Sequence, residues 1–220
     1  MPKILLSWSS GKDSAWSLHL LRRQGAQVAG LLTTVNQAFD RVAMHAVRRT
    51  LVDAQAAAAG LPLWTVPLPW PCSNAEYERV MSKVCAQAVA DGYTAVAFGD
   101  LFLTEIRAYR LKMLEGTGLE PLFPVWDLPT RALAEEMMAS GLKAKITCVD
   151  PRVLPASMAG RDFDAAFVKS LPAGADPCGE NGEFHSFVYD GPMFRHPVPV
   201  TVGEVVERDG FVFADVLPVS

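Results

Sequence analysis

The residues most able to do chemistry lie in two short stretches far apart in the chain. The first, "SSGKDS" at residues 9–14, combines a glycine, serine hydroxyls, a lysine and an aspartate. It follows an apolar run and precedes a helical pattern, so we expect it where a buried strand runs into a helix. Unpaired amides at a helix N-terminus attract anions, and glycine lets the backbone curl around them. The stretch therefore predicts a phosphate-binding turn.

This turn differs from the common Walker loop. Leu6 stands where that loop begins with glycine, and Asp13 follows Lys12 where the loop needs a hydroxyl. Lys12 still supplies positive charge, and Ser14 can donate from the first helical turn. Asp13 suits either a helix cap or a metal ligand. Taken alone, the hexapeptide also fits a well-capped strand-to-helix turn without any ligand.

The second stretch, residues 178–183, reads "CGENGE" and precedes a strand expected at residues 184–189. Its carboxylates, Glu180 and Glu183, could hold a magnesium ion, bind an amine, or act as acid and base. Such charges also occur on ordinary solvated turns. Cys178 has no helix start or histidine beside it, so we expect a small buried side chain rather than a nucleophile.

The elements around these stretches alternate between strands and helices. Glycines just past the expected helix ends support the assignment, and the alternation predicts an α/β fold with a doubly wound parallel sheet. Ligands bind such sheets beyond the carboxyl ends of the strands. The expected strands are 3–8, 27–34, 62–68 and 93–98; the expected helices are 13–24, 41–59, 74–90 and 101–115.

Beyond about residue 100 the alternation of strands and helices becomes less regular. We expect a sheet domain over residues 1–118 and a smaller α+β portion over residues 119–220 packed on it. A short strand is expected in "LFPVW", a helix at residues 130–140, and a strand in "AKITCV". The chain ends in two β-rich runs joined by Asp209-Gly210, a dipeptide typical of tight hairpin turns. This hairpin offers an edge to a second subunit, so a homo-oligomer is one expectation.

Composition narrows the class of protein. The chain has 220 residues, of which 50% are hydrophobic, and a formal net charge of -4. That charge argues against nucleic acid and anionic lipid as partners. No apolar run approaches the roughly 20 residues that span a bilayer. Four cysteines without paired spacing, and an N-terminus without a secretory pattern, favour a reduced cytoplasmic protein.

Both stretches resemble motifs of known families. "SSGKDS" resembles the S-G-G-x-D-S signature of the PP-loop ATP pyrophosphatases, with Ser10 where most members carry glycine. "CGENGEFHS" resembles the G-E-G-G-E-[FY]-[ET] motif of the diphthine–ammonia ligase family, with Asn181 for a glycine and His185-Ser186 for Glu-Thr. "MHAVRR" and "AFGDLFLTEIRAYR" also look like that family, so the resemblance covers nearly the whole chain.

The resemblance implies a reaction and its participants. ATP, with Mg²⁺, would adenylate a substrate carboxylate and release pyrophosphate, and ammonia would then displace AMP to give an amide. The carboxylate would be protein-borne diphthine or a small molecule. The implied ATP-binding residues are Ser9, Ser10, Gly11, Lys12, Asp13, Ser14, Gly99 and Asp100, with Asp13 and Asp100 as the metal ligands.

The same resemblance implies roles for the remaining polar residues. Arg110 matches the family's helix, whereas Arg107, one turn away, is expected on the surface and Trp126 in the core. The implied catalytic residues are Lys12, Asp13, Glu180 and Glu183; the implied substrate-binding residues are Arg110, Asn181, Gly182 and His45.

Two other functions compete with the ligase. Related PP-loop enzymes transfer sulfur to RNA, which requires a persulfide cysteine or metal-binding pairs and a basic surface; Cys148 and Cys178 are too isolated for that. A module that senses ATP without turnover is the third hypothesis. The acidic loop at residues 178–183 would be superfluous in such a sensor.

Overall fold

A computed structural model, which describes residues 2–42 and 46–219, contains two β-sheets. In sheet A, β2, β1, β5 and β6 are neighbours in that order and β4 also pairs with β2, all in parallel. The predicted doubly wound parallel sheet is thus confirmed. Its strands are β1 (Lys3–Ser7), β2 (Gln27–Asn36), β3 (Arg41–Val42), β4 (Leu63–Leu68), β5 (Ala95–Ala97) and β6 (Glu120–Leu122).

Helices cover both faces of sheet A, and alternate residues of β1 face opposite ways. Ile4 and Leu6 pack in one core with α1 and α2, whereas Leu5 packs in a second core with α3 and α4. The strands that follow β1 are added first on its β2 side and later on its β5 side, so the strand order reverses between β1 and β5. A doubly wound fold has its ligand crevice at this point. The four helices are α1 (Lys12–Arg23), α2 (Arg49–Ala59), α3 (Asn74–Ala90) and α4 (Thr104–Leu114).

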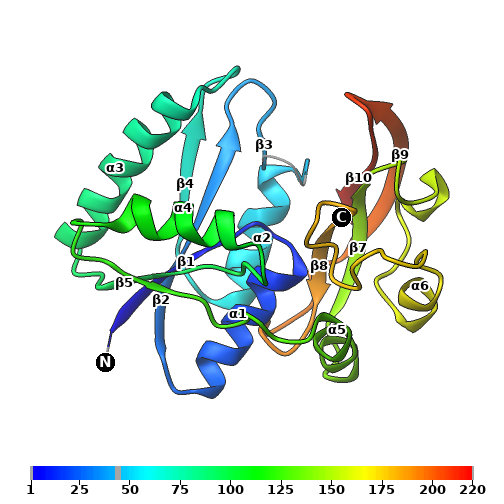
Figure 1. Ribbon diagram of the computed structural model, residues 1–220, viewed down its shortest axis with the longest axis horizontal. Helices are drawn as coiled ribbons and strands as arrows, with labels where there is room; N and C mark the ends of the chain where they lie inside the picture. The colour runs from blue at the N-terminus through cyan, green and yellow to red at the C-terminus, as the bar shows by residue number, and fades with distance from the viewer. Residues whose placement is uncertain (1, 43–45, 220) are drawn as a thin grey trace.

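Sheet B is antiparallel, with the strand order β8-β7-β10-β9, and lies beside sheet A (Figure 1). The predicted hairpin is present: Asp209 and Gly210 take φ values of 53° and 79° between β9 and β10. None of the described helices is long and apolar enough to cross a membrane. The elements of this portion are α5 (Thr130–Ala139), β7 (Lys143–Val149), the short 3₁₀ helix η1 (Ala156–Met158), α6 (Ala165–Lys169), β8 (Phe184–Asp190), β9 (Val200–Arg208) and β10 (Phe211–Pro218).

One hydrophobic core joins the two sheets. Ile146 of β7 and Phe184 and Val188 of β8 belong to the same buried cluster as Ile4 and Leu6 of β1. Because β8 packs directly against α1, sheet B is held close to the turn that precedes that helix.

Ion pairs join the sheets at a second place. Asp215 of β10 bonds Arg41 at 2.9 Å and Arg48 at 2.5 Å. Arg41 belongs to β3, and Arg48 is the residue that precedes α2. Sheet A and the start of α2 therefore contact β10 through ion pairs, in addition to the apolar contact with β8.

Three predicted boundaries were wrong. The helix expected from residue 41 begins at Arg49, because residues 41–42 instead form β3 and pair with the end of β2, with Val42 opposite Val35. The helix expected from Leu101 begins at Thr104, since the amides of Leu101 and Phe102 are bonded elsewhere, as described below. The strand expected in "LFPVW" lies at residues 120–122, so only its leucine takes part.

Candidate functional site

The turn between β1 and α1 is tightly curled. Ser10 takes a left-handed φ of 71°, which explains why the related motif carries glycine there. The Ser10 carbonyl accepts a hydrogen bond from the Val188 amide of β8 at 3.0 Å. On the other side of the turn, the Ser9 hydroxyl lies 3.3 Å from the Gly11 amide and 3.2 Å from the Ser14 hydroxyl. The curl therefore groups hydroxyls and amides at the start of α1.

The carboxyl end of β5 closes in on the same helical turn. A Cβ atom at Gly99 would lie 2.9 Å from backbone atoms of both Asp13 and Ser14, so no side chain fits there. Asp100 follows and pairs with Arg110 of α4 at 3.5 Å. Burial raises the pKa of Asp100, although the positive charge of Arg110 opposes that shift.

Lys12 is almost fully buried, with 2% of its surface exposed. Its Nζ donates to Asp13 Oδ2 at 2.9 Å and to the carbonyl of Cys178, and its backbone amide donates to the Ser186 hydroxyl at 3.2 Å. Burial alone would lower the pKa of Lys12, but the negative charge of Asp13 holds it above its ordinary value. Lys12 therefore carries a full positive charge in the floor of the site.

Glu180 crosses from the C-terminal portion to sheet A. Its Oε1 accepts from the Leu101 amide at 2.7 Å, which keeps that residue out of α4. Burial raises the pKa of Glu180 to about 7, and repulsion from Asp13 adds to the shift, while the bond from Leu101 opposes it. A carboxyl group with such a pKa can take up and release a proton near neutral pH.

Two buried carboxylates brace the loop that carries Glu180. Asp176 Oδ2 accepts from the amides of Cys178 and Glu180 at 3.1 and 3.0 Å. Glu183, only 4% exposed, accepts through Oε1 from the Asp176 amide at 2.9 Å and from Asn181 Nδ2 at 3.0 Å. Sequence reasoning missed Asp176, although an aspartate two residues before an amide that it can accept from is a known turn signal.

A polar cavity of about 230 Å³ lies between the turn, the end of β5 and this loop. Of the predicted site residues that the structure describes, Ser10, Gly11, Asn181, Gly182 and Glu183 do not line the cavity. His45 lies outside the described residues. The cavity brings together Ser9, Lys12, Asp13, Ser14, Gly99, Asp100, Arg110 and Glu180 from the predicted set, and adds Cys178, Gly179, His185 and Ser186.

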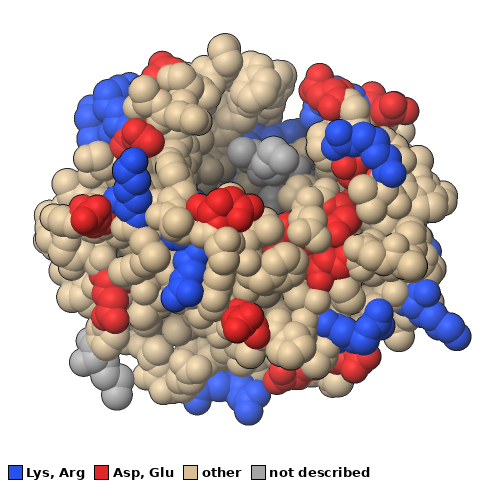
Figure 2. Space-filling model, viewed as in Figure 1, with Lys and Arg blue, Asp and Glu red and all other residues tan. Residues whose placement is uncertain are grey.

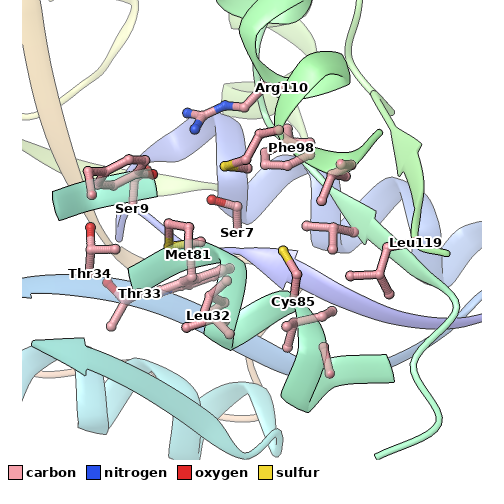
Figure 3. A pocket seen from close by; sticks show the side chains of 18 of the residues that line it. Ser7, Ser9, Leu32, Thr33, Thr34, Met81, Cys85, Phe98, Arg110 and Leu119 are labelled. Carbon is pink, nitrogen blue, oxygen red and sulfur yellow. The ribbon is translucent and has the colours of Figure 1, made fainter. Parts of the chain in front are cut away.

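A larger, mostly apolar cavity of about 410 Å³ adjoins the polar one, and His185 lines both. Figure 3 shows Met81 and Cys85 of α3 and Leu32 of β2 around it, with Arg110 of α4 at the top of the view. Figure 2 shows a hollow between the part that carries α3 and the part that carries β9 and β10.

Within residues 2–42 and 46–219, no cluster of three or more His, Cys, Asp or Glu side chains could hold a metal ion. One observation nevertheless favours a cation beside a bound ligand. Asp13 Oδ1 is buried without a hydrogen-bond partner, although Asp13 lines the polar cavity. Such an oxygen suits Mg²⁺, which usually takes only one or two carboxylates besides phosphate and water.

Three residues near the site contribute to packing rather than to chemistry. Burial raises the pKa of Cys178 to about 12, and its Sγ lies 3.3 Å from a backbone carbonyl, as expected for a buried side chain rather than a nucleophile. Arg107, expected on the surface, instead packs its guanidinium 4.6 Å from the ring centre of Trp126. Trp126, expected in the core, is only half-buried.

The strand order of sheet A, with a tightly curled turn between β1 and α1, defines a doubly wound α/β protein. Residues 129–214 match the diphthamide synthase C-terminal domain. Over 94% of its length the chain is 26% identical to a protein from Bos taurus and 26% identical to one from Homo sapiens, both called diphthine–ammonia ligase, and the match covers 86% of each relative. The resemblance predicted from the sequence is thus confirmed.

A solved structure is also similar in part. It is the predicted subunit of a tRNA methyltransferase from Methanocaldococcus jannaschii, which is 15% identical to this chain with a TM-score of 0.42. The similarity covers 68% of this chain and 78% of that one.

Proposed function

We propose that the chain is an ATP-dependent ligase, which adenylates a substrate carboxylate and joins it to ammonia as an amide. One observation carries the proposal: Lys12 and Asp13, at the start of α1, line the same polar cavity as Glu180. The positive lysine suits a phosphate, and the glutamate suits proton transfer near neutral pH. The ligase names of the similar proteins support the same reaction.

In this proposal the two cavities divide ATP between them. The phosphates take the polar cavity, where the first turn of α1 supplies amides and Ser9 and Ser14 supply hydroxyls. A lysine ammonium has three donors. Two are bonded to Asp13 and to the Cys178 carbonyl, which leaves the third for a phosphate oxygen. The adenosine takes the adjoining apolar cavity, whose volume exceeds that of the polar one.

The chemistry then runs in two balanced steps. In the first step a carboxylate oxygen of the substrate forms a bond to the α-phosphorus of ATP. The bond from that phosphorus to the oxygen of the leaving pyrophosphate breaks. In the second step the nitrogen of ammonia forms a bond to the acyl carbon, and the bond from that carbon to the AMP oxygen breaks. Glu180 takes the proton that the nitrogen loses. Lys12 stabilises the charge that develops on pyrophosphate, and Arg110 binds the substrate carboxylate.

Other predicted residues have supporting parts in this proposal. Asp13 Oδ1, with Asp100, would hold Mg²⁺ against the phosphates, where the ion neutralises negative charge. Asn181, Gly182 and Glu183 shape the loop that presents Glu180, as the contacts of Glu183 suggest. His45 remains a proposed substrate contact.

The substrate and the compartment complete the proposal. The carboxylate is either diphthine carried on a protein or a small molecule. Free thiols at Cys72, Cys85, Cys148 and Cys178 suit a reducing compartment such as the cytoplasm. Burial raises the pKa values of Cys148 and Cys178 to about 12, which disfavours the thiolate that a sulfurtransferase requires.

ATP labelled in its α-phosphate, incubated with Mg²⁺, ammonium and a panel of carboxylates, tests the proposal. We expect AMP and pyrophosphate only when an accepted carboxylate is present, and at least a hundredfold less product from Lys12→Ala. The matched control is Lys83→Ala, which removes an exposed lysine of α3. ADP as the product would refute the mechanism, and tight ATP binding without turnover across the panel would favour the sensor.

A further inference from the structure

Gln55 of α2 is a fully buried polar residue with no part in the proposed reaction. Its side-chain Oε1 accepts from Trp8 Nε1 at 2.9 Å, and its Nε2 donates to the carbonyls of Ser10 at 3.0 Å and Val188 at 2.6 Å. A primary amide offers two N–H donors and one carbonyl acceptor. Both donors and the acceptor are therefore used.

These bonds join three segments that are distant in sequence. Trp8 and Ser10 belong to the turn between β1 and α1, Gln55 belongs to α2, and Val188 belongs to β8. The Ser10 carbonyl accepts from Gln55 and also from the Val188 amide. The residue that adopts the left-handed conformation of the turn is thus the residue that Gln55 and β8 hold together.

The direction of that carbonyl also sets the direction of the next amide. In a planar trans peptide unit, the C=O of one residue and the N–H of the next point opposite ways. Because the Ser10 carbonyl faces Gln55 and Val188, the Gly11 N–H points away from them, towards the Ser9 hydroxyl at 3.3 Å. Ser9 lines the polar cavity although Gly11 does not, so the Gly11 amide acts on the cavity through the Ser9 hydroxyl that it orients.

We propose that Gln55 is a positioning residue, which fixes the peptide between Ser10 and Gly11 so that the turn is shaped for a phosphate before it binds. The inference rests on the proposed binding of ATP phosphates at this turn. An apolar side chain of similar volume would fill the same space without the desolvation cost of a buried amide. The three bonds account for an amide at this position of an otherwise alanine-rich helix segment, "AQAAAA".

Two near-isosteric substitutions test this role. Gln55→Glu keeps the acceptor for Trp8 but places a carboxylate against two carbonyls, and Gln55→Met removes all three bonds. The matched control is Leu51→Ala, which removes buried packing one turn earlier in the same helix but leaves the amide in place. The measurements are ATP affinity by calorimetry and amide hydrogen exchange of a peptide spanning residues 8–14 in the ligand-free protein.

We expect both Gln55 variants to bind ATP about tenfold more weakly and to exchange the amides of residues 8–14 faster, because Gln55→Glu loses two buried hydrogen bonds and Gln55→Met loses three. Leu51→Ala should lower the melting temperature at least as much, yet retain the affinity and the exchange rate at this turn. If the control weakens binding equally, Gln55 has a general structural role and the proposal is wrong.

A second variant covers the case in which both substitutions prevent folding. Trp8→Phe removes the indole donor that orients the amide, together with part of a buried ring that lines the apolar cavity. The deciding measurement for this variant is therefore amide exchange in residues 8–14, which should become faster than in the wild type. Wild-type values for this variant would overturn the proposal. If the wild-type protein itself does not bind ATP, the proposed function fails, while the exchange measurement still decides whether Gln55 fixes the turn.

Discussion

At the scale of single residues, Ser10 is poorly matched to the conformation it adopts. Its φ of 71° lies in the left-handed region, which costs a residue with a Cβ atom about 1 kcal/mol. Its hydroxyl is buried and has no hydrogen-bond partner. Because Ser10 does not line the polar cavity, the backbone of this residue contributes to the turn while its side chain adds strain.

Replacing Ser10 with glycine should therefore raise the free energy of unfolding by about 1 kcal/mol, since relief of the strained conformation and of the unsatisfied hydroxyl outweighs the added flexibility of the unfolded chain. Urea denaturation measures the change. Asp209→Gly is the control. Asp209 has a φ of 53° in the exposed hairpin turn, so this substitution relieves backbone strain without removing a buried hydroxyl. A loss of stability in Ser10→Gly alone would show that the hydroxyl has a partner or a role.

Glu180 predicts a stability that depends on pH. Burial raises its pKa from 4.5 to about 7, so the folded state holds the proton more tightly than the unfolded chain. The penalty for ionising this group is absent below pH 4.5, grows as the pH rises to 7, and is complete above it.

Glu180→Gln keeps an acceptor for Leu101 and removes this charge. At pH 8 it should be more stable than the wild type by about 1 kcal/mol, after allowance for solvent screening of a partly exposed group. The advantage should fade towards pH 5, as measured by urea titrations across the pH range. Glu105→Gln, which changes an exposed carboxylate of α4, is the control. An advantage independent of pH would contradict the raised pKa.

At the scale of elements, the site depends on how closely β5 approaches the first turn of α1. A methyl group at Gly99 would meet backbone atoms of Asp13 and Ser14 at 2.9 Å. Backbone cannot rotate aside, so Gly99→Ala should displace the start of α1, cost about 2 kcal/mol of stability, and weaken ATP binding at least tenfold.

The control for this substitution is Gly30→Ala in β2. The new methyl group there would meet the hydroxyl end of Tyr93 at 2.6 Å, which can move with its side chain. Denaturation and calorimetry on the two variants compare the effects. Equal ATP affinity in Gly99→Ala and the wild type would mean that nucleotide does not bind at this turn.

Local pattern predicted the elements that are specified locally, and failed where distant residues decide the structure. Apolar runs and glycines past the helix ends predicted β1, α1 and α3 to within a residue or two. The start of α2 was missed, because residues 41–42 pair with β2. Lys12 meets the Cys178 carbonyl across 166 residues of sequence. Gln55 reads only as part of a good helix former, since its partners lie in other elements.

At the scale of the whole molecule, the C-terminal portion contributes as much to the turn as the strand and helix that flank it. Val188 holds the Ser10 carbonyl, Ser186 accepts from the Lys12 amide, and Glu180 binds the loop after β5. The apolar core runs through both portions, from Ile4 to Phe184. The site and the core therefore form only when both sheets are folded.

This shared core predicts how the molecule unfolds. We propose that residues 1–118 form a sheet domain but do not fold independently. Without β8, the apolar residues on the side of the sheet that carries α1 and α2 would be exposed to water. Expressed alone, residues 1–118 should lack a cooperative thermal transition and should expose apolar surface to a hydrophobic dye.

The full chain should unfold in one transition, with coincident midpoints by far-ultraviolet circular dichroism and by the fluorescence of its tryptophans, of which Trp8 and Trp16 are fully buried. The control fragment is residues 1–128, which adds β6 and completes sheet A but still lacks sheet B. If this longer fragment folds cooperatively, the deficit of residues 1–118 belongs to sheet A. If it does not, the missing cover of β8 is the cause, and the two portions are one folding unit built around the turn.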